Sequence, residues 1–236
     1  MSMMSFWVGL VAGAFGGLVG LGGGVIMIPL MVRFFGFHQH QAHGTSLAAL
    51  VFTGLTGAVT YAWKGNVDVM AAVVLAATAI LTARFGALYA DSLPEWKLKV
   101  AFGVFIIVVS ALLLAKPLYA QWSHPVQGWP WVAILLASGV VSGFFAGLMG
   151  VGGGSIMVPA MVLFLAFSQH LAQGTSLLAM VPAGLVGAYT HHRLGNVVPG
   201  VVPGLVLGII LGTFGGGTLA QVLPEAYLRI IFAAVL

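Results

Sequence analysis

The sequence predicts an all-α polytopic membrane protein made of two internal repeats. Three observations predict this fold class. Of the 236 residues, 61% are hydrophobic and 5% are charged, with a mean hydropathy of +1.12, whereas a soluble domain carries about 25% charged residues. Continuous apolar runs such as 69–85 and 100–115 approach the roughly 20 residues that a spanning helix requires. Finally, the two halves of the chain align without gaps at an offset of 130 residues.

The duplication is visible along the whole chain. More than half of the positions between Gly20 and Leu50 recur 130 residues later. Short motifs recur at the same offset: Gly44-Thr45-Ser46 as Gly174-Thr175-Ser176, Gly65-Asn66-Val67 as Gly195-Asn196-Val197, and Leu93-Pro94-Glu95 as Leu223-Pro224-Glu225. Duplications of this kind are typical of secondary transporters, whose substrate sites lie where the repeats meet.

We therefore predict a first transmembrane repeat over 1–115, a linker over 116–130 and a second repeat over 131–236. The first repeat divides into five apolar pieces: 5–20, 25–36, 44–63, 67–90 and 95–115. Gly65 is predicted to stop a helix, Asn66 to cap the next one, and Pro94 with Glu95 to start the last. The second repeat ends before this last piece is complete, so we expect its final helix to be truncated.

The first two pieces of each repeat are the unusual ones. Pieces 5–20 and 25–36 are each shorter than a hydrocarbon core of roughly 30 Å, and joined in one rod they exceed it. We therefore predict a re-entrant pair of half-length helices, broken at Gly22–Gly24 and again at Gly152–Gly154. Three spans follow in each repeat, and an odd number predicts inverted repeats. Counts of Lys and Arg on the two sides are nearly equal, so parallel repeats stay open.

The glycine breaks predict an anion site. Helix N-termini carry unpaired N–H groups and a partial positive charge, and glycine lets a ligand approach the backbone. We interpret Gly44-Thr45-Ser46 and its repeat as two further helix starts that add hydroxyl groups. Close helix packing is the alternative for the glycines, and plain capping for the hydroxyls. The predicted substrate-binding residues are Gly22, Gly23, Gly24, His40, Gly44, Thr45, Ser46, Gly152, Gly153, Gly154, His170, Gly174, Thr175 and Ser176.

Other polar residues carry weaker signals. His40 and His170 are equivalent and are expected either to line the anion route or to lie in interfacial loops. The other four histidines considered, which lack an identical partner in the other repeat, are expected at the surface: His38, His43, His191 and His192. Arg84 is expected to extend towards the end of its helix. The chain has no cysteine, no metal-ligand spacing, no run of basic residues for nucleic acid and no acid–base pair for catalysis, so we predict no cofactor, no metal and no enzyme activity.

The glycine-rich stretches 16–29 and 146–159, each ending in proline, and the Ala-x-Gly-Thr-Ser-Leu runs ending at Leu47 and Leu177 resemble the TauE/SafE family of sulfite and organosulfur anion exporters. The resemblance covers essentially the whole chain. It implies a multi-pass protein of the bacterial inner membrane that exports sulfite, a sulfonate such as sulfoacetate, or a related anion. Related thiosulfate importers use cysteines, which this chain lacks.

The sequence thus favours a secondary transporter that holds a small sulfur-containing anion at helix N-termini from both repeats. A passive anion channel and an importer of a related sulfur oxyanion remain alternatives. The lipid bilayer is the expected partner, and homo-oligomerisation, the coupling ion and the exact substrate stay open.

Overall fold

The computed structural model describes residues 3–114, 128–224 and 227–228, and within these ranges the chain forms nine α-helices and no strand. The first half contains α1 (Met3–Val19), α2 (Gly24–Phe35), α3 (Gln39–Ala62), α4 (Val69–Ser92) and α5 (Glu95–Leu114). The second half contains α7 (Trp129–Met149), α8 (Gly154–Phe164), α9 (Gln169–Arg193) and α10 (Val202–Val222).

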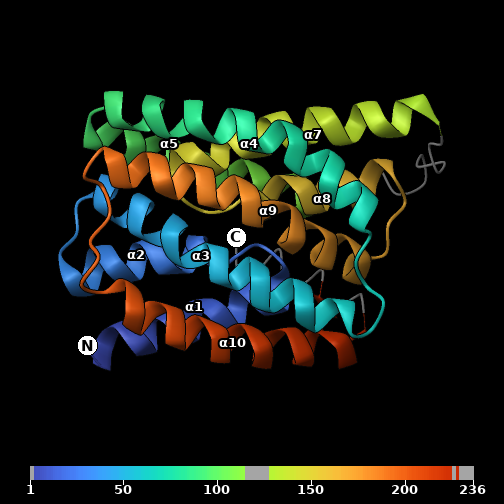
Figure 1. The fold of residues 1–236 in the computed structure, drawn as a ribbon, viewed down its shortest axis with the longest axis horizontal. Helices are drawn as coiled ribbons and strands as arrows, with labels where there is room; N and C mark the ends of the chain where they lie inside the picture. Colours follow the sequence, from blue (N-terminus) through green and yellow to red (C-terminus); the bar gives the residue numbers. More distant parts are fainter. Residues whose placement is uncertain (1–2, 115–127, 225–226, 229–236) are drawn as a thin grey trace.

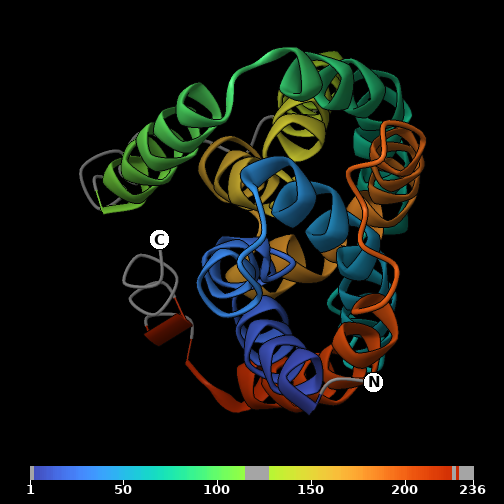
Figure 2. The same cartoon turned by 90° about the vertical axis from the view of Figure 1, so that its left-hand side faces the viewer.

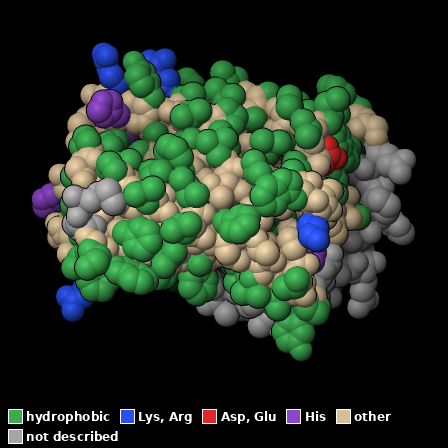
Figure 3. All heavy atoms as spheres, turned by 60° about the horizontal axis from the view of Figure 1, so that its bottom comes forward, with side chains coloured by type: hydrophobic (Ala, Val, Ile, Leu, Met, Phe, Trp, Pro, Cys, Tyr) green, Lys and Arg blue, Asp and Glu red, His purple; other side chains and the backbone are tan. Residues whose placement is uncertain are grey.

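Five of the described helices are long and apolar enough to cross a membrane by length and composition: α3, α4, α7, α9 and α10. The surface agrees with this assignment. Figure 3 shows a face covered by hydrophobic side chains, with the basic, acidic and histidine side chains towards its edges. The chain is therefore a multi-pass helical membrane protein, as the sequence predicts.

The helices form layers with the two short ones between them. In Figure 1, α4, α5 and α7 lie at the top, α1 and α10 at the bottom, and α3 and α9 run between. Figure 2 looks along the long helices and shows α2 and α8 inside the bundle, with α5 at one side. The glycine breaks that precede α2 and α8 therefore lie in the interior.

Small residues let the helix backbones approach closely, and these contacts give the helix directions. A Cβ at several glycines of α1 and α7 would collide with the backbone of α10 or α4. The facing pairs rise together in number, so α1 is parallel to α10 and α7 to α4: Gly9 with Leu205, Gly13 with Ile209, Gly139 with Leu75, Gly143 with Ala79. Close packing through glycine is usual for membrane helices.

The central pair α3 and α9 runs the other way. Gly184 packs against Val51, whereas Gly187 packs against Leu47. One residue number rises while the other falls, so α3 and α9 are antiparallel. They are equivalent helices at the 130-residue offset, so equivalent elements of the two halves run in opposite directions.

Each short helix forms a hairpin with the helix before it. Ser5, near the start of α1, packs against Gly204, and Gly44, near the start of α3, packs against Asn196. Both contacts lie around the connection between α9 and α10, so the α1–α2 pair enters and leaves at one end of the bundle. The break separates α1 from α2 as predicted, and residues 5–36 do not form one continuous helix.

The prediction that both helices of each re-entrant pair have half the length of a span holds only for the second helix of each pair. α2 and α8 have 12 and 11 residues, but α1 has 17 and α7 has 21, which correspond to about 25 and 31 Å. The expectation is wrong for α7, which is long enough to span. The reason is that Trp129 and Pro130 begin α7, capped by Gly128, and do not belong to the linker.

Three predicted helix boundaries are also wrong. α3 begins at Gln39, so Gly44-Thr45-Ser46 lies in its second turn and is no helix start; likewise α9 begins at Gln169, before Gly174. Apolar character, which set the prediction, begins later than the helix, whose first turn is polar. The N-cap of α4 is Asp68, whose carboxylate accepts from the Ala71 N–H at 2.9 Å, and not Asn66. Residues 116–127 of the expected linker 116–130 and the expected truncation of the last helix lie outside the described residues.

Candidate functional site

The two glycine breaks touch each other at the centre of the molecule. A Cβ at Gly24 would lie 2.6 Å from Val151 Cα, and one at Gly154 would lie 2.9 Å from Leu21 Cα. Gly22 and Gly23 adopt φ of 90° and 84°, in the left-handed region that favours glycine. Glycine is therefore required both for the turn of the chain and for the contact between the breaks. The structure brings Gly22–Gly24 and Gly152–Gly154 together, and we call this contact the crossing of the breaks.

The helices that end at the breaks have their terminal carbonyls covered by donors. The last carbonyl groups of an α-helix lack partners and carry partial negative charge. Ser46 Oγ donates to Gly150 O at 2.8 Å and Ser176 Oγ donates to Gly20 O at 2.9 Å. These bonds come from α3 and α9 to the C-terminal ends of α7 and α1, and each is the counterpart of the other at the 130-residue offset.

A second donor pair covers the preceding carbonyls. Tyr61 OH lies 2.9 Å from Gly17 O, and His191 Nε2 lies 2.8 Å from Gly147 O. Because a carbonyl oxygen only accepts, the tyrosine and histidine groups are the donors. Tyr61 and His191 occupy equivalent positions in the two repeats. The negative ends of α1 and α7 are thereby neutralised from both sides of the crossing.

In the helices that start at the breaks, α2 and α8, the first backbone N–H groups have no acceptor within the helix. The first intrahelical bonds of α2 run from Ile26 and Met27 to Gly23 O, and those of α8 from Ile156 and Met157 to Gly153 O. Helix geometry leaves the N–H groups before these positions without an intrahelical acceptor. Ser155 Oγ, in the first turn of α8, is 2% exposed and has no hydrogen-bond partner. The crossing therefore presents donors and a partial positive charge.

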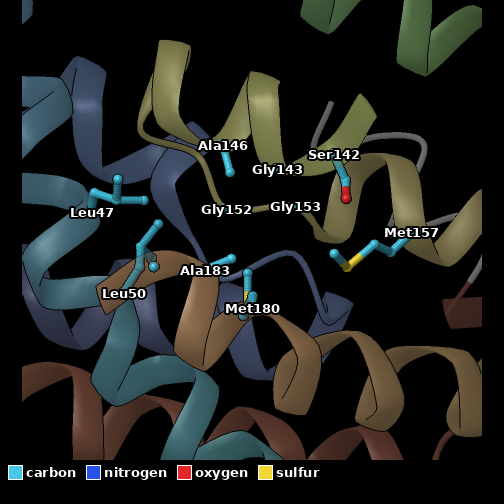
Figure 4. A pocket seen from close by; sticks show the side chains of 11 residues that line it. Leu47, Leu50, Ser142, Gly143, Ala146, Gly152, Gly153, Met157, Met180 and Ala183 are labelled. Atoms are coloured by element: carbon cyan, nitrogen blue, oxygen red, sulfur yellow. The ribbon is translucent and has the colours of Figure 1, made fainter. Parts of the chain in front are cut away.

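A small cavity lies against the second break. Figure 4 shows Gly152 and Gly153 in the middle of a ring of side chains from α3, α7, α8 and α9, including Leu50, Ser142 and Met180. The cavity has a volume of about 10 Å³, close to the 10–15 Å³ that a single water molecule needs. Most of its lining is apolar. The crossing is thus closed in this conformation, and side chains must move before a larger ligand enters.

The threonines of the two Gly-Thr-Ser triplets hold loops in place. Thr45 Oγ1 accepts from the Val198 N–H at 3.0 Å, and Thr175 Oγ1 accepts from the Asp68 N–H at 2.9 Å. Gly44 and Gly174 pack against the backbones of Asn196 and Asn66. Neither triplet lines the cavity. Their bonds instead connect the helices that carry them to the opposite half of the chain.

The structure does not bring His40 and His170 to the cavity. His40 Nε2 lies 3.1 Å from Ala90 O and 3.0 Å from Leu93 O, and His170 Nε2 lies 3.0 Å from Ala220 O. Both rings therefore contact carbonyls at the C-terminal end of the neighbouring helix, α4 or α10. Arg84 is exposed on α4; that its side chain extends towards the end of the helix stays a prediction.

Sequence reasoning missed two buried histidines. His43 and His191 were expected at the surface, but each is 0% exposed; the expectation holds for His38 and His192, which are exposed. These histidines have no identical partner in the other repeat, because His43 aligns with Gln173 and His191 with Tyr61. All four are polar and buried, so a comparison by hydrogen-bonding capacity finds them. Among the described residues, no group of three or more His, Asp or Glu is arranged to hold a metal ion.

Comparison with known proteins identifies the class. The family described as Sulfite exporter TauE/SafE matches residues 5–236. A protein of Bacillus subtilis, "Probable membrane transporter protein YunE", is 30% identical over 212 residues, which are 80% of this chain and 78% of that protein. A "Probable membrane transporter protein" of Xylella fastidiosa is 31% identical over 191 residues, 78% of this chain and 71% of the relative.

A more distant relative comes from an archaeon. "Probable membrane transporter protein MJ0441" of Methanocaldococcus jannaschii is 26% identical over 162 residues, 66% of this chain and 60% of that protein. No solved structure matches the chain. The matching family and these relatives are described as membrane transporters and not as enzymes. The chain belongs to the TauE/SafE family.

Proposed function

We propose that the chain is a secondary transporter that exports sulfite or a small organosulfonate anion such as sulfoacetate across the inner membrane. The observation that carries this proposal is the contact between the two glycine breaks. It places the N-terminal ends of α2 and α8 beside each other while donors cover the C-terminal ends of α1 and α7. The remaining polar groups at the crossing are N–H donors and the Ser155 hydroxyl, which suit an anion.

We further propose that the two repeats are inverted and related by a pseudo-two-fold axis through the crossing. The opposite directions of α3 and α9 support this arrangement. Inversion lets one site be reached alternately from either side by movement of one repeat against the other. The closed cavity of about 10 Å³ fits an occluded step of such a cycle.

The predicted binding residues have direct and indirect roles in this proposal. Gly22, Gly23 and Gly24 with Gly152, Gly153 and Gly154 offer backbone N–H groups directly. Ser46 and Ser176 act indirectly, because they donate hydrogen bonds to carbonyl oxygens that would otherwise repel an anion. Gly44, Thr45, Gly174 and Thr175 hold the repeats together around the site. His40 and His170 act on the anion route only through the helix ends that they contact.

Weak, distributed binding favours a carrier over a tight binder. A helix end contributes about 0.3–2 kcal/mol to holding a charge, so two ends hold an anion loosely enough for release. A site made of backbone donors favours a group with charge spread over several oxygens. Sulfite and sulfonates have that property, and the family description points to sulfite.

Flux measurements in liposomes test the proposal. Purified protein is reconstituted and challenged with sulfite, sulfoacetate, sulfate and phosphate, each with and without the same anion trapped inside. We expect saturable uptake of sulfite or sulfoacetate that trapped anion accelerates. Flux that rises linearly with concentration and ignores trapped anion would instead indicate a passive channel, and the absence of flux for the whole panel would contradict the proposal.

Competition with taurine tests whether the partial positive charge of the helix ends determines which substrate binds. Its ammonium group brings a positive charge to the partly positive helix ends, so we expect excess taurine to leave the uptake of labelled sulfoacetate unchanged. Unlabelled sulfite at the same excess is the positive control. Competition by taurine as strong as that by sulfite would show that other groups read the substrate.

A further inference from the structure

The clearest difference between the two ends of the molecule is a pair of buried histidines at one of them. His43 and His191 are fully buried, and their rings lie near enough for their charges to interact. At the other end, the equivalent positions hold Gln173 and Tyr61, bonded to each other at 2.9 Å. The chain thus places two imidazole rings at one end, and a glutamine and a tyrosine at the matching positions of the other.

His191 has a vacant proton acceptor. Its Nε2 lies 2.8 Å from Gly147 O and must carry the hydrogen, because a carbonyl cannot donate. The neutral ring then has a bare lone pair on Nδ1, which is buried and has no hydrogen-bond partner. A buried basic nitrogen without a partner is costly, so its presence in a folded protein calls for an explanation. Proton binding at Nδ1 converts it to a donor and leaves the bond to Gly147 intact.

His43 is held between two oxygen atoms. Its Nδ1 lies 3.2 Å from Leu148 O, and its Nε2 lies 3.0 Å from the side-chain oxygen of Gln39. A neutral imidazole donates only one hydrogen, so this arrangement is complete for an imidazolium. For a neutral ring, the Gln39 amide has to turn and offer its nitrogen. The site can therefore exist with and without the second proton, with Gln39 adjusting between the two states.

An open cavity and several charged side chains lie near the two histidines. An open cavity of about 400 Å³ is lined by Gln39 and Phe102, with Arg33 at its wall, and the His43 ring packs on Phe102 with centroids 5.7 Å apart. The titratable neighbours are His40 on α3, Asp91 on α4, Arg33 on α2 and Glu95 on α5, which accepts from the Gln39 N–H. α7 contributes the carbonyl groups of Gly147 and Leu148, which favour a cation at its C-terminus.

We propose that His43 and His191 form a proton-binding pair that couples anion transport to proton movement in the same direction. The inference rests on the proposed anion site. Both rings contact the last turn of α7, immediately before the break that lines the anion site. A proton there adds positive charge beside the anion and raises the affinity for it, and by linkage the anion raises the affinity for the proton. The two ligands therefore travel together.

The direction remains compatible with export. A divalent anion that moves with one proton still carries one negative charge across the membrane. A membrane potential that is negative inside drives that charge outward. Flux of a divalent substrate is then outward whenever the membrane potential exceeds the opposing proton gradient.

The opposite repeat supplies the test variants. His43→Gln and His191→Tyr introduce the residues found at the equivalent positions, which keep polar groups of suitable shape and remove the basic imidazole nitrogens. Exposed His192→Gln is the matched control, because it removes a histidine of α9 outside the cluster. Methanesulfonate is the probe, because it stays fully ionised and any proton that moves with it must be carried by the protein.

Uptake of labelled methanesulfonate is measured in liposomes whose membrane potential is held at zero. With the interior one pH unit more alkaline, one proton per anion supports about tenfold accumulation. We expect this from the wild type and from His192→Gln, while the double variant still exchanges internal for external anion but does not accumulate it. Accumulation by the double variant equal to wild type, or accumulation driven by the reversed gradient, would overturn the proposal.

A second measurement does not require flux. ¹⁵N-labelled histidine signals of the purified protein are assigned by their loss in each single variant and followed as the pH is lowered. We expect the His43 or His191 signals to change to those of an imidazolium, at a higher pH when methanesulfonate is present. If both rings stay neutral wherever the protein is folded, the proton pair is wrong. If they titrate while no anion of the panel moves, the proposed transport function fails and proton binding stands.

Discussion

At the scale of single residues, glycine at the crossing of the breaks is required for packing, and the chain contains a suitable control. Gly154→Ala places a Cβ against the Gly20 carbonyl and 2.9 Å from Leu21 Cα, where backbone atoms cannot move aside. Gly215 lies in α10 with nothing within 4 Å of its Cβ position. We expect Gly154→Ala to lower the free energy of unfolding by about 1–3 kcal/mol.

Thermal unfolding in detergent measures the effect. Gly215→Ala should leave the unfolding temperature unchanged or raise it slightly, because alanine favours a helix by up to about 1 kcal/mol over glycine. Equal stability of both variants would show that the two breaks do not touch as described.

The serine hydroxyls at the breaks carry a prediction about affinity. Ser46→Ala or Ser176→Ala uncovers the carbonyl of Gly150 or Gly20 next to the proposed anion site. A buried, unpaired carbonyl costs about 1–3 kcal/mol, and its negative end repels the anion. We expect each variant to weaken anion binding by about tenfold or more, which corresponds to 1.4 kcal/mol.

Calorimetric titration with sulfite or methanesulfonate provides the measurement. Ser92→Ala is the control, because the Ser92 hydroxyl bonds to Tyr89 O at an exposed position at the end of α4. Affinities of Ser46→Ala and Ser176→Ala that match the Ser92→Ala value would restrict the two serines to a structural role.

At the scale of helices, the antiparallel contact of α3 with α9 predicts which residues can be cross-linked. The chain has no cysteine, so introduced pairs react without background. Val51 packs against Gly184, and at the equivalent contact Val181 packs against Gly54. We expect the double variants Val51→Cys/Gly184→Cys and Gly54→Cys/Val181→Cys both to form disulfides under mild oxidation.

The cross-link is detected as altered mobility after the chain is cleaved between the two halves. Single-cysteine variants serve as controls for contacts between different molecules. Formation of neither disulfide would contradict the antiparallel packing, and with it the main support for inverted repeats.

At the scale of the whole molecule, inversion predicts that equivalent loops face opposite sides of the membrane. Lys64 and Arg193 are exposed residues just after α3 and at the end of α9. In intact cells, a thiol reagent that cannot cross the membrane should label only one of Lys64→Cys and Arg193→Cys. After permeabilisation both should react. Labelling of both from the same side would mean that the repeats are parallel.

The sequence by itself determined the class of protein and the place of the breaks. Low charge and long apolar runs exclude a water-exposed surface, and helices are the structures that satisfy their own backbone in a lipid environment. Gly22–Gly24 and Gly152–Gly154 interrupt those runs, so the separation of α1 from α2 and of α7 from α8 follows from local conformational preference. The offset of 130 residues likewise follows from the sequence alone.

The tertiary structure decided where each polar group finds its partner. Hydropathy cannot locate the start of α3, because a polar first turn is stabilised by contacts with α4 and α5 that lie about 50 residues away in the chain. The role of Ser46 depends on a carbonyl in the other half. The burial of His43 and His191 depends on α7 packing over them. Such partners are set by helix packing across the two halves, and a hydrogen bond between distant segments leaves no periodic trace in either of them.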